Sequence, residues 1–337
     1  MSAAPCSRRN ASILLSARGR ISISRHITFR SDGSANVLLV PKLVDSLAGR
    51  MEILRLHPLA QCELAEKLPR FLDRLFDAAF KVRTYERLGA ELAERLVPGG
   101  YPAALARPTT RRRTAWYRDY IETLVQRDVR DLARINSLDA LPRLLALGAS
   151  QTARLLNITD LAGPFQLSRP TIRDYVTLLE RVFLIDTLAP WHSNRLSRLI
   201  KTPNLHLGDT GVACALLGLD ATALTKDRTT LGQILETFVF QELRRQASWR
   251  ETSIAFYHFR DKDGAEVDIV MERGAHAIAG VEVKASSTVT SADFRGLRKL
   301  RDAAGRRFAA GVVLYDGESS ASFGDQLYAV PIRTLWE

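Results

Sequence analysis

The stretch from Leu231 to Ser286 constrains the fold more than any other part of this sequence. It begins with an apolar run whose helical spacing predicts a buried helix over 231–246. Three short apolar runs follow, and turn residues separate each run from the next. These runs predict strands over Ile254–Phe259, Ala265–Met271 and Ala277–Lys284. A helix followed by two hairpins predicts a mixed α/β domain.

Charged residues interrupt this apolar stretch at four positions. Glu282 and Lys284 are two residues apart in one strand, so their side chains share one face. Asp268 lies on the neighbouring strand and converges on Glu282, and Glu236 reaches the same place from the helix. Two carboxylates with a backbone carbonyl and waters suit Mg²⁺, which predicts metal binding by Asp268 and Glu282. Lys284 would orient a water or offset phosphate charge, and Glu236 would act through water or a second ion, so all four are predicted catalytic residues.

The elements that follow complete a larger pattern. Ser291 begins a predicted helix, and Ala309–Tyr315 is an apolar run typical of a buried strand. The resulting α-β-β-β-α-β order, together with Asp268 and the Glu282-x-Lys284 pair, resembles the restriction-endonuclease-like, PD-(D/E)xK fold. This resemblance implies metal-dependent cleavage of phosphodiester bonds. The alternative is that the same charged residues form a buried ion network in a degenerate, inactive domain.

A block near the N-terminus resembles part of a nucleotide-binding module. Residues 33–64 read GSANVLLVPKLVDSLAGRMEILRLHPLAQCEL, and a Gly-Gly-Tyr-Pro sequence follows at 99–102. Both resemble a bacterial and archaeal AAA-type ATP-binding family that carries the domain of unknown function 4143 at its C-terminus. By this resemblance Arg50 would be the remnant of an arginine finger, although a solvated charge after a helix end is the alternative. A P-loop needs G-x-x-x-x-G-K-[ST], and no Gly-Lys-Ser/Thr occurs, so the sequence predicts a truncated member that does not itself bind ATP.

The middle of the chain contains a helix-turn-helix pattern between Ile158 and Leu184. Ser168 is placed to cap the second helix, whose buried stripe would be Ile172, Tyr175, Val176 and Leu179. The basic residues that follow could form a wing. The functional interpretation places four arginines against DNA, namely Arg169, Arg173, Arg195 and Arg198. The alternative is a winged helix used for packing or for contacts with a protein.

Composition adds weaker constraints. The formal charge of +11 suggests a polyanionic partner, but six arginines and no acid lie in residues 1–30. That Arg/Ser-rich segment predicts a disordered leader or a wrongly assigned start, with an organelle transit peptide as the alternative. Three scattered cysteines and six scattered histidines form no zinc motif and fit a reducing cytosol. No apolar run reaches the ~18 residues of a membrane span.

The sequence therefore predicts four segments. They are a leader over 1–30, an AAA-type remnant over 31–97, a helical region with a winged helix-turn-helix over 98–205, and a PD-(D/E)xK nuclease-like domain over 206–337. The predicted function is that of a cytoplasmic, DNA-associated protein that hydrolyses phosphodiester bonds with Mg²⁺. The alternative is a non-catalytic module that binds nucleic acid or protein, and a protein partner or homo-oligomer fits either prediction. ATP binding would belong only to full-length relatives.

Overall fold

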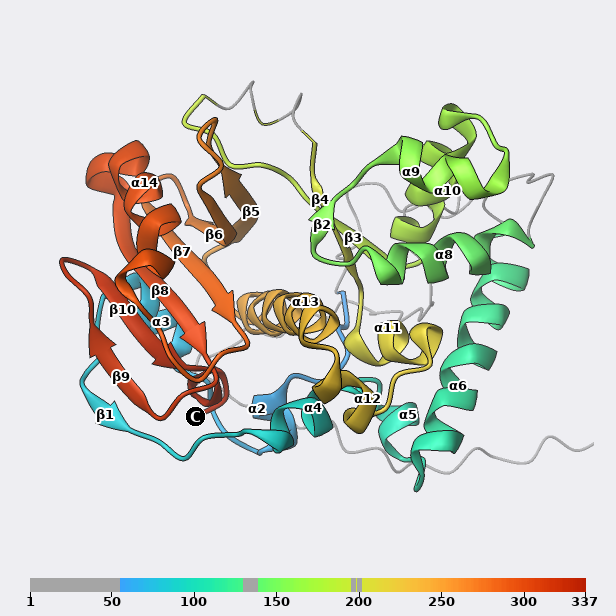
Figure 1. The fold of residues 1–337 in the computed structure, drawn as a ribbon, viewed down its shortest axis with the longest axis horizontal. Helices are drawn as coiled ribbons and strands as arrows, with labels where there is room; N and C mark the ends of the chain where they lie inside the picture. Colours follow the sequence, from blue (N-terminus) through green and yellow to red (C-terminus); the bar gives the residue numbers. More distant parts are fainter. Residues whose placement is uncertain (1–54, 130–138, 195–197, 199–201) are drawn as a thin grey trace, which may run out of the picture. The chain divides into compact units, whose positions relative to one another are not determined.

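The computed structural model describes residues 55–129, 139–194, 198 and 202–337 (Figure 1). The predicted leader, Arg50 and Arg195 lie outside these residues. So do the predicted early strand and helix of the AAA-type block. Within the described residues, no helix is both long enough and apolar enough to cross a membrane.

Seven of the described strands form one sheet in the order β1-β9-β10-β8-β7-β6-β5. Their bounds are β1 Arg83–Thr84, β5 Ile254–Arg260, β6 Glu266–Arg273, β7 Ala277–Lys284, β8 Phe308–Tyr315, β9 Ser319–Ser322 and β10 Leu327–Pro331. The predicted antiparallel hairpins β5-β6-β7 are confirmed. Gly264 and Gly274 take positive φ values of 74° and 58° in the two turns, a conformation that glycine adopts without steric cost. β8 is parallel to both β7 and β10.

Helices cover both faces of this sheet. The predicted apolar helix is α13, Arg228–Ala247, and it packs with α3, Phe71–Phe76, against Val281 and its neighbours. The helix α14, Arg295–Ala304, covers the other face, where Leu297 and Leu300 pack on Ile278. A Cβ atom on Gly280 would lie 2.7 Å from the Cδ2 atoms of both leucines, so a larger residue there would displace these side chains. The observed order from α13 to β8 is the predicted α-β-β-β-α-β order.

A smaller sheet lies in the middle of the chain, with strand order β2-β4-β3. The strands are β2 Arg154–Leu155, β3 Ile185–Leu188 and β4 Asn204–Leu207, and the helices beside them are α8 Ala140–Ser150, α9 Ile158–Ala162 and α10 Arg169–Arg181. Ser168 Oγ accepts a hydrogen bond from Thr171 N at 3.2 Å, which confirms the predicted cap. The predicted buried stripe of α10 is confirmed as well. The boundary predicted between residues 205 and 206 falls inside β4, whose partners β2 and β3 both precede it.

The remaining described helices lie before, between and after these strands along the chain. They are α2 Gln61–Leu64, α4 Ala90–Leu96, α5 Pro102–Leu105, α6 Thr110–Thr123 with a π-helical continuation Leu124–Val129, α11 Thr210–Leu217 and α12 Ala221–Lys226, and the short 3₁₀ segments are Gly163–Phe165, Ser291–Phe294, Gly305–Arg307 and Ile332–Leu335. The described part of the predicted 31–97 segment is not separate from the C-terminal sheet. Its strand β1 pairs with β9, and α3 packs on β7 and β8.

A buried polar cluster joins these segments. Asp209 caps α11, since its Oδ1 accepts from Gly211 N at 2.8 Å. Its other oxygen accepts from Gly100 N at 2.9 Å and from Arg245 Nη2 at 2.8 Å. A Cβ atom on Gly99 would lie 2.0 Å from Asp209 Oδ1, which gives the Gly-Gly-Tyr-Pro sequence a physical reason. This cluster ties the start of the middle region to α13.

Candidate functional site

The predicted acids and lysine meet where β6 and β7 separate. The paired register of these strands ends at Ile269 and Val281. One residue beyond that point, Asp268 Oδ2 accepts a hydrogen bond from Val283 N at 2.7 Å. Lys284 Nζ donates to Glu282 Oε1 at 2.7 Å, as expected for two residues on one face of a strand. At the end of the ladder the Asp268 carboxylate therefore replaces a backbone carbonyl as the acceptor for an N–H group of β7.

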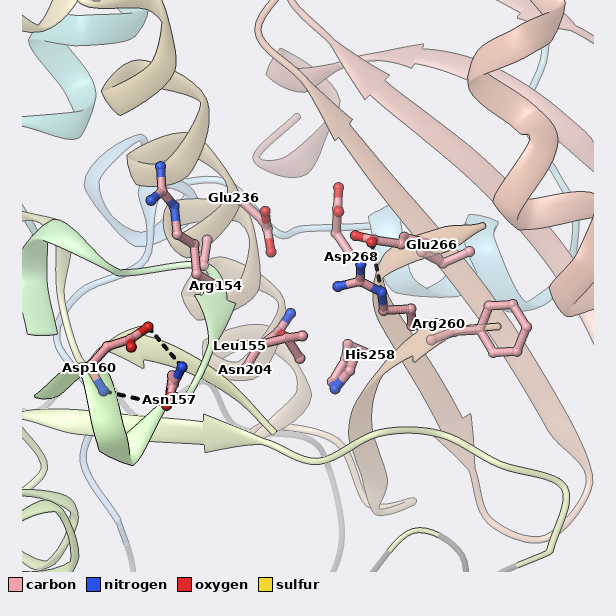
Figure 2. Close-up of a pocket in the computed structure, with 13 residues that line it drawn as sticks. Arg154, Leu155, Asn157, Asp160, Asn204, Glu236, His258, Arg260, Glu266 and Asp268 are labelled. Carbon is pink, nitrogen blue, oxygen red and sulfur yellow. Dashed lines mark hydrogen bonds and ion pairs between the residues drawn. The ribbon is translucent and has the colours of Figure 1, made fainter. Parts of the chain in front are cut away.

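Glu236 approaches this strand end from α13. It lines a cleft of about 410 Å³ together with Asp268. Figure 2 shows the two carboxylates directed into the same cleft from the helix and from β6. Burial, followed by the charges of Asp268 and Glu282, raises the pKa of Glu236 well above its usual value. The three predicted acids are thus close enough to interact electrostatically.

Burial in this place shifts the pKa of each of the three predicted acids. Burial raises the pKa of Asp268 to about 6. Burial and then the Asp268 charge raise the pKa of Glu282 to about 8. Burial opposes the charged form of Lys284, but the carboxylate of Glu282 outweighs it and raises the pKa of the lysine. The site therefore has one basic side chain and three acidic side chains close together. This excess of acidic groups favours the binding of an additional cation.

The donor set fits Mg²⁺ in part. Glu282 Oε2 is buried and has no hydrogen-bond partner among the described residues, so it is available as a ligand. Within the same residues, no group of three or more His, Cys, Asp or Glu side chains is arranged to hold a metal ion. Mg²⁺ commonly uses one or two carboxylates and keeps several waters. Asp268 and Glu282 could hold such an ion, whereas a site built entirely from side chains is not formed.

The second wall of the cleft was not predicted from the sequence. It comes from β2 and its surroundings, which contribute Arg154, Asn157, Asp160 and Asn204 (Figure 2). The sheet side adds further polar residues, namely His258, Arg260 and Glu266. No local pattern marks these positions, because β2 is two residues long and lies far from α13 in sequence. Glu236 and Asp268 thus lie in a cleft bounded by both sheets.

A buried histidine behind Glu236 was also missed. His206 on β4 is fully buried, and its Nδ1 lies 3.1 Å from Thr237 Oγ1. Its Nε2 lies 4.0 Å from Glu236 Oε1. Burial lowers the pKa of His206 to about 3, so the ring is neutral near pH 7 and this contact is not an ion pair.

The predicted DNA-contacting arginines have different environments. Arg169 and Arg173 are exposed on α10, as expected. Arg198 is not on an exposed wing: it is 8% exposed, and its Nη1 lies 2.7 Å from Glu272 Oε2. Its Nε also donates to His192 O at 2.7 Å. The prediction for Arg198 is corrected, because Glu272 is buried on β6 and requires a buried cationic partner.

Comparison with known proteins places two matched regions on this fold. Residues 89–223 match the Domain of unknown function (DUF8612), and residues 231–335 match the Domain of unknown function (DUF4143). The junction between the two matches falls near the start of α13, not at 205/206. The second match covers α13, the three hairpin strands, α14 and the strands that follow.

Two curated relatives are similar over most of this chain. They are the uncharacterized proteins Rv2008c of Mycobacterium tuberculosis and Mb2031c of Mycobacterium bovis, each 26% identical over 301 residues. The match covers 89% of this chain and 60% of each relative, so the chain spans less than two thirds of their length.

One solved structure also matches at a low level. It is the assembly of Thermococcus gammatolerans McrB AAA+ hexamers with bound McrC, with 12% identity and a TM-score of 0.23 over 58% of this chain and 72% of that chain. A TM-score this low does not establish a shared fold. The comparisons therefore relate each of two regions of this chain to its own domain family. The DUF4143 match contains the acids and the lysine at the strand ends and most of α13.

Proposed function

We propose that the DUF4143 domain of this chain is a nuclease of the PD-(D/E)xK type that hydrolyses phosphodiester bonds with Mg²⁺. The observation that carries the proposal is the junction of β6 and β7, where Asp268 replaces a backbone acceptor and the paired Glu282 and Lys284 follow. Glu236 faces the same cleft from α13. The α-β-β-β-α-β order around these residues supports the same assignment.

Each residue would have a distinct task in this reaction. Asp268 and Glu282 would hold Mg²⁺, which would supply positive charge at the reacting phosphate. Lys284 has a raised pKa and stays protonated, so it would stabilise charge on the phosphate or orient a water. Glu236 has a strongly raised pKa and would hold a proton beside the reacting group.

The middle region would bind the nucleic acid. Its order, helix, strand, two helices and two strands, with the sheet order β2-β4-β3, supports a winged-helix assignment. Arg169 and Arg173 are exposed near the start of α10, where they would reach phosphates or base edges. The cleft between this region and the acids would receive the strand to be cut.

Plasmid cleavage tests the catalytic proposal. The chain is incubated with supercoiled plasmid and Mg²⁺ or Mn²⁺, beside Lys284→Ala and Asp268→Ala. A matched control is Lys226→Ala, because Lys226 ends α12 outside the site. We expect cleavage by the wild type and the control, and loss with both site variants. Equal cleavage by every protein, or cleavage by none, would contradict the proposal.

A second candidate is a non-catalytic module with a degenerate nuclease fold, which binds nucleic acid or protein. The observation in its favour is that, in the described part of the chain, no set of three or more potential ligands is arranged for a metal. It predicts nucleic-acid or protein binding that is unchanged by Lys284→Ala. A protein partner or a homo-oligomer is compatible with either candidate, and ATP binding is proposed only for longer relatives.

A further inference from the structure

Residues 107–118 contain a dense group of arginines and no acid. Of the 48 Lys and Arg residues, six lie in 1–30 and five lie in 107–118, a stretch with no acid. The remaining 37 basic residues are balanced by the 37 acids. The five form what we call the arginine cluster, namely Arg107, Arg111, Arg112, Arg113 and Arg118. This segment therefore carries five positive charges and no negative charge over twelve residues.

The arginine cluster lies around the first half of α6, whose N-terminal end is next to α5 (Figure 1). All of its members are exposed except Arg113, which is half-buried and donates from Nη2 to Arg107 O at 3.5 Å. No member forms an ion pair with an acid in the described residues. Arg111 and Arg118 are seven residues apart, so they share one face of the helix. Several guanidinium groups are thus free to bind an anion together.

The position of the cluster opposes helix stability. The first turn of α6 contains no acid, and Thr109 alone caps it by accepting from Arg112 N at 3.3 Å. Positive charge near a helix N-terminus is unfavourable because it faces the positive end of the helix dipole. Adjacent arginines also repel one another. This arrangement costs stability in the isolated chain, and a polyanion would reverse that cost.

We propose that the arginine cluster binds the phosphate backbone of a nucleic acid without sequence preference. Guanidinium groups match phosphate oxygens in a bidentate manner. An anionic membrane is the less suitable partner, because Tyr117 and Ile121 of α6 are buried and the half-buried Trp116 stacks on Tyr120 at 5.1 Å. No apolar face of α6 is left to enter a bilayer. The cluster is separate from the acids of β6 and β7, so this binding does not require them.

Salt-dependent binding tests this proposal. The affinity of the full chain for a short duplex is measured in EDTA, which removes any cleavage, at several potassium chloride concentrations. The test variant carries Arg111→Gln, Arg112→Gln and Arg118→Gln. Each lost phosphate contact reduces the slope of log K against log salt by about 0.9, so we expect a reduction of about 3. Affinity at moderate salt should fall on the order of 100-fold.

A charge-matched control separates a local site from a general effect of net charge. It carries Lys67→Gln, Arg70→Gln and Arg306→Gln, three exposed residues outside the cluster. We expect its slope to stay close to that of the wild type. Equal slopes for the two triple variants, or an unchanged slope in the test variant, would overturn the proposal. Binding to anionic vesicles without binding to DNA would also overturn it, and cleavage activity does not enter any outcome.

Discussion

Asp268 Oδ2 accepts a hydrogen bond from the backbone N–H of Val283 at 2.7 Å, just beyond the last paired residues of β6 and β7. A carboxylate thus occupies a place where a sheet normally has a carbonyl. The same carboxylate raises the pKa of Glu282 and Glu236. Asp268 therefore has a structural role and an electrostatic role, and two substitutions can separate them.

Asp268→Asn should keep the hydrogen bond and remove the charge. We expect its free energy of unfolding at neutral pH to equal or exceed that of the wild type, because one of three crowded acids is neutralised. Asp268→Ala should lose about 1–3 kcal/mol, since the partly buried N–H of Val283 loses its acceptor. Urea unfolding measures both values. Equal destabilisation by the two variants would show that the charge, not the hydrogen bond, stabilises this strand end.

Divalent cations should stabilise the folded chain if Asp268 and Glu282 hold one. At a cation concentration of 100 Kd the expected gain is about 2.7 kcal/mol, seen as a rise in Tm. Glu282→Gln should abolish most of this rise, because it removes a charged ligand whose Oε2 has no other partner among the described residues. Glu318→Gln is the matched control, an exposed acid after β8. Identical Mg²⁺ shifts in both variants would contradict metal binding at this strand end.

The buried cluster at Asp209 should contribute far more to the free energy of unfolding than a surface ion pair does. Arg245 Nη2 lies 2.8 Å from Asp209 Oδ2, and its Nη1 lies 3.0 Å from Glu242 Oε1. Arg245→Met should cost about 3–5 kcal/mol, because two buried acids lose their cation. Arg250→Met breaks the exposed pair with Asp73 and should cost less than about 1 kcal/mol. Chemical denaturation compares them, and similar losses would mean that the cluster adds no special stability.

Arg198 should behave differently from the arginines of α10. Arg198→Gln leaves Glu272 with Arg307 as its remaining cationic partner, so we expect a lower Tm and little change in DNA affinity. The double variant Arg169→Gln and Arg173→Gln should weaken DNA binding and leave Tm nearly unchanged, because both side chains are exposed. Thermal unfolding and a binding titration test the pair. Loss of DNA affinity in Arg198→Gln at unchanged Tm would restore its predicted role.

Local patterns predicted the parts of the site that depend on neighbouring residues. The alternation of a strand places Glu282 and Lys284 on one face, and the glycine turns place Asp268 beside them. The cap at Ser168 and the buried stripe of α10 were predictable for the same reason. The cleft wall at Arg154 depends on a pairing between β2 and β4, which are about fifty residues apart and carry no periodic signal.

Long-range partners also explain the predictions that needed correction. Arg198 lies in a basic run typical of an exposed loop. In the structure it forms a buried ion pair with Glu272, which is 74 residues later in the chain. The predicted boundary at 205/206 separates part of β4 from strands that precede it, whereas β4 pairs with both β2 and β3. In both places a contact between distant segments outweighs the local pattern.

The neutral state of His206 should make stability depend on pH. Burial lowers its pKa to about 3 in the folded chain, against about 6.5 in the unfolded chain. Between these values the unfolded state binds a proton that the folded state does not. Above pH 6.5 the ring is neutral in both states, and His206 does not reduce the free energy of unfolding. As pH falls from 6.5 towards 3, protonation of the unfolded state lowers the free energy of unfolding by about 1.4 kcal/mol per pH unit.

His206→Gln isolates this contribution, because Glu236 beside it titrates with the opposite sign. The raised pKa values of Glu236, Asp268 and Glu282 favour the folded state as pH falls, so the slope of the wild type alone mixes several groups. The measurement is the difference in unfolding free energy between the two proteins at pH 7 and at pH 5. Glutamine can still bond to Thr237 Oγ1 and cannot take up a proton, so wild type should lose stability relative to the variant by about 2 kcal/mol over this interval. A difference that does not change with pH would mean that His206 takes up its proton without unfolding, which would place the ring in contact with solvent through the cleft at Glu236.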